Sequence, residues 1–439
     1  MRSPFDLRRV IGKVAIGAVL LFLAAFAASS SKENQLAGSA RVVSVEEVQT
    51  GRAVTTVDAE AARAEVAQRT PVRAIGDPYG LFSAVGLDLR NKEVILQDEN
   101  LFRILTYDRT ANTPPSAPLS EPKRFIAGDM TNLALNCALY VDPQNGDIYT
   151  VNNDSIDSTV VFSRQAKGNV APDREFHTPH GTFGIAVDEK EQEAFFTVQH
   201  SHAVVVFPKM AKGEDPPVRS IQGDHTGLGD PHGIAIDSKN DLIFVSNFGS
   251  TNTMRRSTTT TRSYGRGPQG KEFWPLDRDD AVPGSGRNVP PSITVYPKKA
   301  SGDAAPLRVI QGPATQLNWP AGMAVDSERG ELYVANDMDA SVLVFSTSAN
   351  GDTAPIRMLK GPKTLLKYPD GVALDLENHE LWVANFGNHA ATVYKLDASG
   401  DTAPLRMIRS GPLNANVPAL GNPFSVAFDT KRKEILVPN

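Results

Sequence analysis

Histidine is concentrated in one part of this chain. Six of the eight histidines lie between His177 and His232, and the other two follow that segment. Neutral imidazoles joined by a carboxylate are ligands that suit Zn²⁺, so His180, His200 and His232 are candidate ligand-binding residues. No H-x-x-x-H spacing accompanies them. Histidines of exposed loops are the alternative explanation, and the identity of any metal stays open.

A second set of polar residues recurs at the ends of strand-like segments. These positions all carry a carboxylate or an amide: Asp98, Asn152, Gln199, Asn247, Asn336, Asn385 and Asn439. Oxygen atoms of this kind, converging on one channel, would suit Ca²⁺, which prefers oxygen ligands. Asn and Asp side chains also hold the backbone of turns. Asn152, Asn247, Asn336 and Asn385 are therefore candidate ligand-binding residues, with a turn-forming role as the alternative.

A third set lies five residues before a repeated aspartate and is chemically uneven: Ser83, Cys137, Phe183, His232, Ala321, Asp370 and Phe424. A nucleophile, a base and an orienting acid need hydrogen bonds of about 3 Å. Cys137, His232 and Asp370 fall in alternate units of the repeat described next, where roughly 10 Å should separate them. We therefore expect no catalytic triad, and Asp370 remains a candidate ligand-binding residue.

All three sets belong to an internal repeat. Apolar segments that end in aspartate recur along the chain, at Asp88, Asp142, Asp188, Asp237, Asp326, Asp375 and Asp429. Asp188 and Asp237 are 49 residues apart, as are Asp326 and Asp375, and one insertion lengthens a single interval. A fixed period of this length indicates a repeat architecture.

Each unit has the pattern of four short β-strands. The aspartate is followed by a polar turn and a second segment, such as Leu332–Asn336, and then by a third segment rich in β-branched residues. A G-D-x-A-P-x-R turn, such as Gly351–Arg357, leads into a fourth segment. Four antiparallel strands per unit match a propeller blade, so the sequence predicts an all-β fold, a β-propeller.

The number of blades depends on how the two ends of the chain meet. The chain stops after the second segment of its last unit, and Pro71–Gly76 resembles the fourth-strand sequence Pro404–Ile408. Pairing N- and C-terminal strands would complete a blade and remove an exposed sheet edge. This favours seven four-stranded blades over residues 70–439, with six as the alternative. Residues 30–69 are expected to be a linker with a short helix, and they are the candidate source of one propeller strand.

The repeat resembles a known class of exported bacterial propellers. The P-x-G-x-A-x-D segment, the L-Y-V-A-N segment and the G-D-x-A-P-x-R turn are similar to NHL and YVTN-type repeats, from about Pro71 to Asn439. The resemblance implies a β-propeller and leaves function open, because this fold includes scaffolds, ligand binders, lactonases and lyases. Gluconolactonase-like propellers join a glutamate to such Asn and Asp positions, and no glutamate occupies the matching register here.

One insertion, residues 249–291, interrupts the repeat between a second and a third strand. It carries Arg255 and Arg256, then Phe273 and Trp274, in a background rich in Gly, Ser, Thr and Pro. Exposed aromatic side chains often mark an interaction site. We therefore consider it a candidate lid or docking arm over the channel mouth, with a loosely packed loop as the alternative.

The N-terminus indicates export. A basic start is followed by the apolar run Val14–Ala28 and an A-x-A site, which predicts a signal peptide or membrane anchor over residues 1–29. The protein is then periplasmic or extracellular, and touches a membrane only through residues 14–28. A net charge of -5 opposes nucleic-acid binding. The single cysteine, Cys137, excludes an internal disulfide.

These observations favour a non-enzymatic monomer that binds a protein, peptide or glycan at the channel mouth, because no convergent acid, base or metal set is evident. The alternative is a lactonase, hydrolase or lyase of the gluconolactonase-like type that depends on Ca²⁺ or Zn²⁺. No cofactor is predicted for the first hypothesis.

Overall fold

A computed structural model describes residues 77–153, 156–256 and 279–413, together with 61, 64, 415, 427–429, 431 and 434–436. The chain divides into two compact units, residues 1–74 and 75–439, and all strands within the described residues belong to the second. No helix within the described residues is both long and apolar enough to span a bilayer. The predicted segments 1–29 and 30–69 lie outside the description, apart from residues 61 and 64.

The described residues form six four-stranded antiparallel sheets, the blades, with strands in chain order from the inside outward. Blades 1 to 3 are β1 (Phe82–Asp88), β2 (Glu93–Asp98), β3 (Arg103–Asp108), β4 (Arg124–Ile126); β5 (Asn136–Val141), β6 (Ile148–Asn152), β7 (Ser158–Phe162), β8 (Arg174–His177); and β9 (Thr182–Asp188), β10 (Glu193–Val198), β11 (Ala203–Pro208), β12 (Arg219–Ile221). This confirms the predicted all-β propeller.

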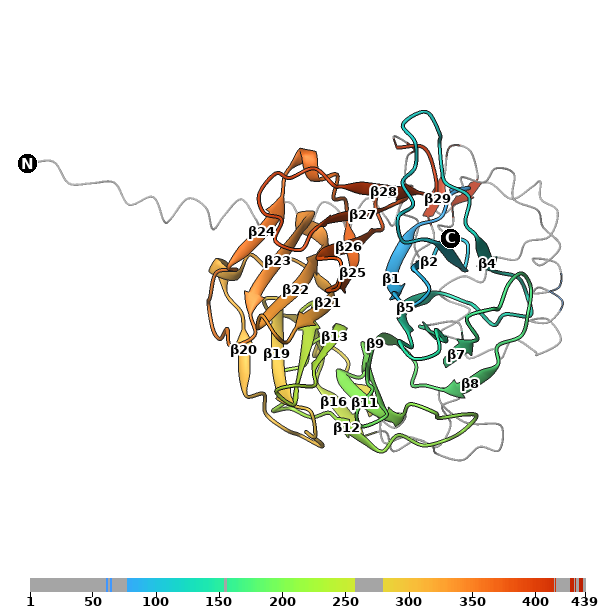
Figure 1. Ribbon diagram of the computed structural model, residues 1–439. Helices are drawn as coiled ribbons and strands as arrows, with labels where there is room; N and C mark the ends of the chain where they lie inside the picture. Colours follow the sequence, from blue (N-terminus) through green and yellow to red (C-terminus); the bar gives the residue numbers. More distant parts are fainter. Residues whose placement is uncertain are drawn as a thin grey trace, which may run out of the picture. The chain divides into compact units, whose positions relative to one another are not determined.

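Blades 4 to 6 follow the same order: β13 (Pro231–Asp237), β14 (Leu242–Asn247), β19 (Ser292–Pro297), β20 (Arg308–Ile310); β21 (Pro320–Asp326), β22 (Glu331–Asn336), β23 (Ser341–Ser346), β24 (Arg357–Lys360); and β25 (Pro369–Asp375), β26 (Glu380–Asn385), β27 (Ala390–Lys395), β28 (Arg406–Arg409). The innermost strands surround a central channel (Figure 1). β29 (Ala427–Asp429) and β30 (Glu434–Leu436) form a separate two-stranded pair.

A small residue in each innermost strand lets neighbouring blades approach closely. A Cβ on Gly322 would lie 2.6 Å from the Asp370 carbonyl oxygen, and one on Gly371 would lie 2.9 Å from the Ser83 carbonyl oxygen. Real Cβ atoms do not come so near a backbone oxygen, and overpacking of this kind is destabilising. Glycine therefore occurs in the repeated P-x-G-x-A-x-D pattern because a larger side chain would collide with the backbone of the next blade.

The G-D-x-A-P-x-R turn joins each blade to its neighbour. Gly351 of blade 5 donates its backbone N–H to the Val309 carbonyl of blade 4 at 2.7 Å, and Asp352 accepts the Ala314 N–H at 2.7 Å. The arginine of the turn, Arg357, forms a two-pronged ion pair with Glu331 at 2.7 Å in its own blade. The motif thus holds a blade together and attaches it to the blade before it.

The ring closes with six blades, so the preference for seven was wrong and the alternative of six was right. In blade 1, Thr113 takes the place of the turn glycine and donates its N–H to the Met407 carbonyl of blade 6 at 2.8 Å. Arg409 donates its own N–H to Thr113 Oγ1 at 2.8 Å. Within the described residues, the final blade is therefore joined directly to the first.

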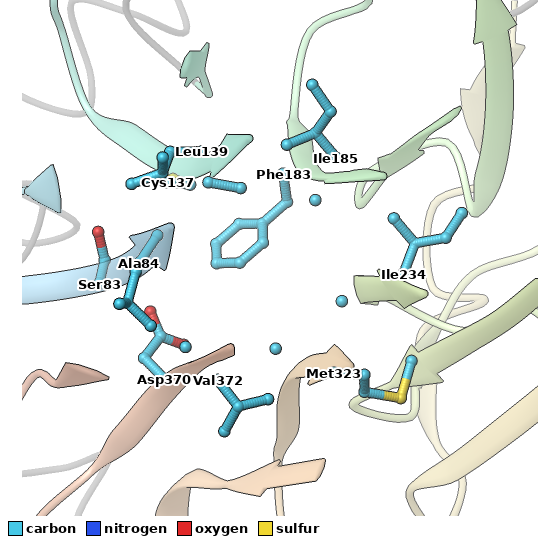
Figure 2. A pocket seen from close by; sticks show the side chains of 16 residues that line it. Ser83, Ala84, Cys137, Leu139, Phe183, Ile185, Ile234, Met323, Asp370 and Val372 are labelled. Carbon is cyan, nitrogen blue, oxygen red and sulfur yellow. The ribbon is translucent and has the colours of Figure 1, made fainter. Parts of the chain in front are cut away.

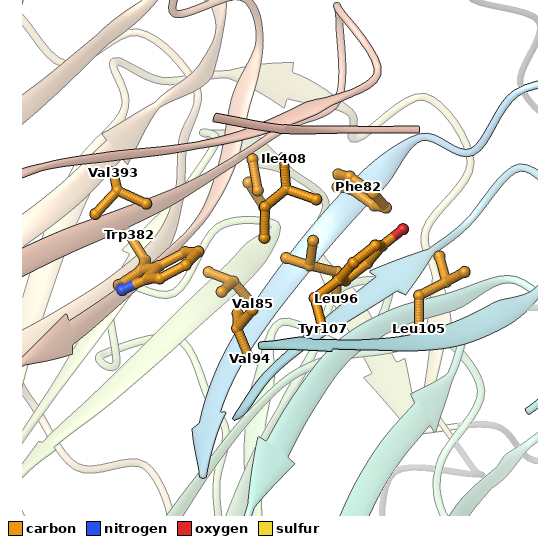
Figure 3. Packing of buried hydrophobic residues seen from close by; sticks show 11 residues of the cluster. Phe82, Val85, Val94, Leu96, Leu105, Tyr107, Trp382, Val393 and Ile408 are labelled. Atoms are coloured by element: carbon orange, nitrogen blue, oxygen red, sulfur yellow. The ribbon is translucent and has the colours of Figure 1, made fainter. Parts of the chain in front are cut away.

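A shared hydrophobic core accompanies this closure. Phe82, Val85 and Tyr107 of blade 1 pack in one buried cluster with Trp382 and Ile408 of blade 6 (Figure 3). The prediction of seven blades failed because the segment ending at Asp429 resembles the six blade anchors, yet its strand β29 pairs only with β30 within the described residues.

The insertion contains more backbone pairing than a loose loop. β15 (Ser250–Thr251) pairs with β18 (Arg287–Asn288), and β16 (Met254–Arg256), which carries Arg255 and Arg256, pairs with β17 (Asp279–Ala281). Phe273 and Trp274 lie outside the described residues. At its base, Asn252 donates its N–H to His202 Nε2 of blade 3 at 3.1 Å. The insertion is thus attached at the side of the mouth formed by blades 3 and 4.

Six-blade closure predicts that a chain ending after Leu413 keeps a cooperative unfolding transition. We expect its thermal midpoint to stay within a few degrees of the full chain, roughly the effect of 1 to 2 kcal/mol in a large domain. Circular dichroism melts measure this. A chain ending after Tyr368 lacks blade 6 and should lose the transition. Loss of the transition in both chains would show that residues after Leu413 are needed for closure.

Candidate functional site

The central channel is divided by a ring of aliphatic side chains. Each innermost strand contributes one residue at the same register: Val85, Leu139, Ile185, Ile234, Met323 and Val372. Beside this ring is a cavity of about 80 Å³ (Figure 2). One water molecule needs roughly 10–15 Å³ in this kind of measurement. The cavity therefore has room for several waters or one small organic group.

The strand positions two residues earlier also line the cavity. Ser83, Cys137, Phe183 and Asp370 contribute to its wall, and Phe183 projects toward the centre from the side opposite Asp370 (Figure 2). No described residue donates a hydrogen bond to the Asp370 carboxyl. Burial, and then the negative charges of Asp337 and Glu99, raise the pKa of Asp370 well above its usual range. Strongly perturbed carboxyls in cavities are characteristic of functional sites.

Above the cavity, the residue that follows the second strand of each blade forms a ring around the mouth. Its members, the mouth ring, are Glu99, Asn153, Gln199, Phe248, Asp337 and Phe386. Each donates its backbone N–H to the residue before the innermost strand, as Phe248 does to Asp230 (3.1 Å) and Asp337 to Trp319 (3.1 Å).

Gln199 belongs to the mouth ring, one position later than the sequence register placed it. Its N–H bonds the Gly181 carbonyl at 2.8 Å, and the preceding Val198 pairs with Thr182 as Asn247 pairs with Pro231. The error arose because blade 3 has valine where the other described blades have an amide or carboxylate, so the repeat was aligned on the wrong polar residue.

One side of the mouth is acidic. Glu99, Asp337 and Asp370 come from blades 1, 5 and 6, which are neighbours in the closed ring. Burial raises the pKa of Asp337 to about 7, and its Oδ1 atom is buried without a hydrogen-bond partner among the described residues. Ionised carboxyls in this setting lack the donors that normally compensate for lost hydration.

The other side is aromatic. Phe183, His232, Phe248 and Trp319 form a continuous row, the aromatic stack, with ring-centre distances of 4.4, 3.4 and 4.9 Å between successive members. Burial lowers the pKa of His232 to about 3, so its ring is neutral. Trp319 ends the row and is 48% exposed. The stack therefore runs from the cavity wall to the open mouth.

The structure brings the three predicted histidines into neighbouring positions on blades 3 and 4. His180 Nδ1 lies 3.0 Å from Asp157 Oδ1, and its ring stacks on that of His200 at 5.5 Å. His232 is buried, with Nε2 2.6 Å from Gln199 Nε2. Asp370 lies on blade 6 instead. Within the described residues, no three His, Cys, Asp or Glu side chains are placed to hold one metal ion.

The four predicted asparagines serve the loops that lead into the innermost strands. Each is buried, and each accepts a backbone N–H through Oδ1: Asn152 from Ala134, Asn247 from Gly229, Asn336 from Asn318 and Asn385 from Lys367, at 2.7 to 3.2 Å. Their amides are thus engaged in their own blades, as the turn-forming alternative describes, and we leave them out of the proposed site.

Sequence reasoning missed most of the mouth. Phe248 and Asp337 directly follow the asparagines that attracted attention, and Trp319 precedes the proline that begins β21. Two positions should have been compared among the repeat units: the residue after the second strand and the residue before the innermost strand. That comparison would have shown that some units carry an aromatic or acidic residue there. Their grouping into two sides of the mouth depends on ring closure, which the sequence left open.

Comparison with known proteins adds a partial family match. Residues 299–413 match the SMP-30/gluconolactonase/LRE-like region, and no curated protein matches the chain. This segment resembles that propeller family over blades 5 and 6. Among solved structures, hydrazine synthase of Kuenenia stuttgartiensis is similar, with 15% identity, a TM-score of 0.46, and coverage of 74% of this chain and 99% of that one.

The raised pKa of Asp337 predicts a pH-dependent cost in stability. A carboxyl whose pKa is about 7 in the folded state and near 4 when unfolded stabilises the fold at low pH, and this stabilisation is lost as pH rises from about 4 through 7. At pH 8, Asp337→Asn should therefore be more stable than the parent by about 1–3 kcal/mol. The difference should shrink at pH 5.

Urea denaturation at both pH values measures this difference, and Glu328→Gln is the control because the Glu328 side chain is 79% exposed. An Asp337→Asn protein that is no more stable than the parent at pH 8 would contradict this prediction. It would show that the ionised Asp337 carboxylate does not destabilise the fold.

Proposed function

We propose that this propeller binds a small organic ligand at the channel mouth. The observation that carries the proposal is the Asp370 carboxyl, which faces a cavity of about 80 Å³ and accepts no hydrogen bond from a described residue. Asp337 and the aromatic stack extend the same site outward. A cavity with few polar groups beside aromatic surface is the usual form of a small-molecule site.

Binding is favoured over catalysis by the arrangement of the polar groups. Burial lowers the pKa of His232 to about 3, and its Nε2 atom lies 2.6 Å from Gln199 Nε2, so His232 is a weak base and poorly suited to remove a proton. Cys137 directs its sulfur to the Leu135 carbonyl at 3.3 Å. The nucleophilic and basic side chains near the cavity are thus engaged elsewhere, while the carboxyls are available to a ligand.

We further propose that the site works outside the cytoplasm. The apolar run Val14–Ala28 supports export, with a cleaved signal peptide or an inner-membrane anchor as its two forms. A single cysteine is compatible with either form, because exported proteins do not require disulfides. We propose a monomer that functions without a cofactor.

A second candidate function is metal-dependent hydrolysis of a lactone. It is supported by the match of residues 299–413 to the SMP-30/gluconolactonase/LRE-like region. The Asn336 and Asn385 oxygens already bond backbone N–H groups of Asn318 and Lys367. This function would therefore require those loops to open before the two amides could reach a metal ion.

The binding proposal predicts ligand-induced stabilisation that depends on the mouth. In thermal melts of the full chain against a panel of amines, amino acids, monosaccharides, carboxylates and sugar lactones, at least one class should raise the midpoint, as ligands of the folded state do. Trp319→Ala should abolish this shift, whereas Leu405→Ala, at an exposed position just before the outer strand β28 of blade 6, should not. Equal shifts in both variants would place binding away from the mouth.

The hydrolase candidate makes a separate prediction. Bound Ca²⁺ or Zn²⁺ should survive dialysis in stoichiometric amount, and a chelator should lower the thermal midpoint by several degrees, because metal binding stabilises the folded state. Elemental analysis and melts with and without chelator measure both. A metal-free protein whose melt ignores chelator, and which hydrolyses no sugar lactone with added metal, would contradict the hydrolase candidate.

A further inference from the structure

The two sides of the mouth together have the chemistry of a cation receptor. We infer that the ligand carries a bulky organic cation, a substituted ammonium group, held between the exposed ring of Trp319 and the carboxyls of Asp337 and Asp370. The inference rests on the proposed function, because it assigns a ligand class to the same site.

Asp337 and Asp370 have no positively charged partner within the described residues. Burial raises the pKa of Asp337, and burial with negative neighbours raises that of Asp370, while no basic side chain lowers either. Lys360 pairs with Asp339 at 2.7 Å, and not with Asp337 or Asp370. Since neighbouring carboxylates repel one another, a bound cation would stabilise their ionised forms.

The spacing of these carboxyls favours a large cation over a metal ion. Glu99, Asp337 and Asp370 are near enough for their charges to interact, yet they are not placed to share one metal ion. A metal ion would need oxygen ligands within roughly 2.0–2.6 Å of one point. A substituted ammonium group is several times wider, so it can interact with carboxyls that stand apart.

Trp319 supplies the surface that such a cation prefers. Its backbone carbonyl accepts the Asp337 N–H at 3.1 Å, so the indole and the carboxyl arise from adjacent positions of blade 5. Phe248 stacks against the indole at 4.9 Å, and the indole remains 48% exposed. The face of tryptophan attracts cations more strongly than the other aromatic rings, and the attraction increases when water is excluded.

A neutral sugar is the competing ligand class. Sugars also stack on exposed aromatic rings, and carboxyls can bond their hydroxyl groups. A neutral ligand, however, does not reduce the repulsion among Glu99, Asp337 and Asp370. The structure therefore favours the cation, and the sugar is an outcome that the experiment distinguishes.

Choline and 3,3-dimethyl-1-butanol are a matched pair of probes, because they differ only in a charged nitrogen replacing a neutral carbon. Saturation-transfer difference NMR on the full chain at pH 8 gives the Kd of each. We expect choline to bind at least about tenfold more tightly than the alcohol, the contribution of a cation near an aromatic face and carboxylates. Glucose and CaCl₂ are measured in parallel.

Three variants test whether the Asp337 and Asp370 carboxyls cause the preference for choline. Asp370→Asn and Asp337→Asn should each weaken choline binding about tenfold and change alcohol binding by less than about twofold, because the amide keeps the shape and removes the charge. Glu328→Gln removes an exposed carboxylate on the outside of the propeller and should leave both Kd values unchanged. Cooperative melting transitions with midpoints at or above that of the parent would establish that the variants are folded.

The outcomes separate this inference from the proposed function. Equal binding of choline and the alcohol, both lost in Trp319→Ala, would overturn the cation inference and leave the mouth as a binding site. Binding of glucose alone would do the same and assign the site to sugars. Competition between CaCl₂ and choline would overturn the cation inference and indicate that the carboxyls bind a metal ion. If neither matched probe binds and the broader panel gives no mouth-dependent shift, both proposals are wrong.

Discussion

The close approach of six innermost strands is the constraint on which the rest of this structure depends. Glycine at the position of Gly322 and Gly371 allows the backbones of adjacent blades to come within contact. The side chains one position away then share a narrow channel. Asp370 is one of them, so the packing that closes the ring also partly shields its carboxyl from water.

Ring closure also determines which unlike residues become neighbours. The latch between Thr113 and Met407 brings blade 1 against blade 6, and with it Glu99 toward Asp370. Next to this acidic group, blades 3 to 5 align Phe183, His232 and Phe248 with Trp319. The regular repeat thus serves as a rigid frame, and variation at three registers gives the mouth its acidic and aromatic sides.

The fold was largely predictable from the sequence, and the site was only partly so. Periodic aspartates such as Asp188 and Asp237 identify blades because each ends the same strand. Asp370 was found because its register points to the channel. Asp337 was missed because its carboxyl stands out as a site residue only when it is seen near Asp370. That proximity depends on how the ring closes, and the sequence repeat favoured closure with seven blades.

The most direct test of the account is the number of protons released when choline binds at pH 7. Calorimetric titrations in two buffers of different ionisation enthalpy give this number. A carboxyl with a pKa of about 7 is half protonated there, so a cation that binds its ionised form must expel part of a proton. The account predicts net release that Asp337→Asn reduces; binding without release, or with proton uptake, would contradict it.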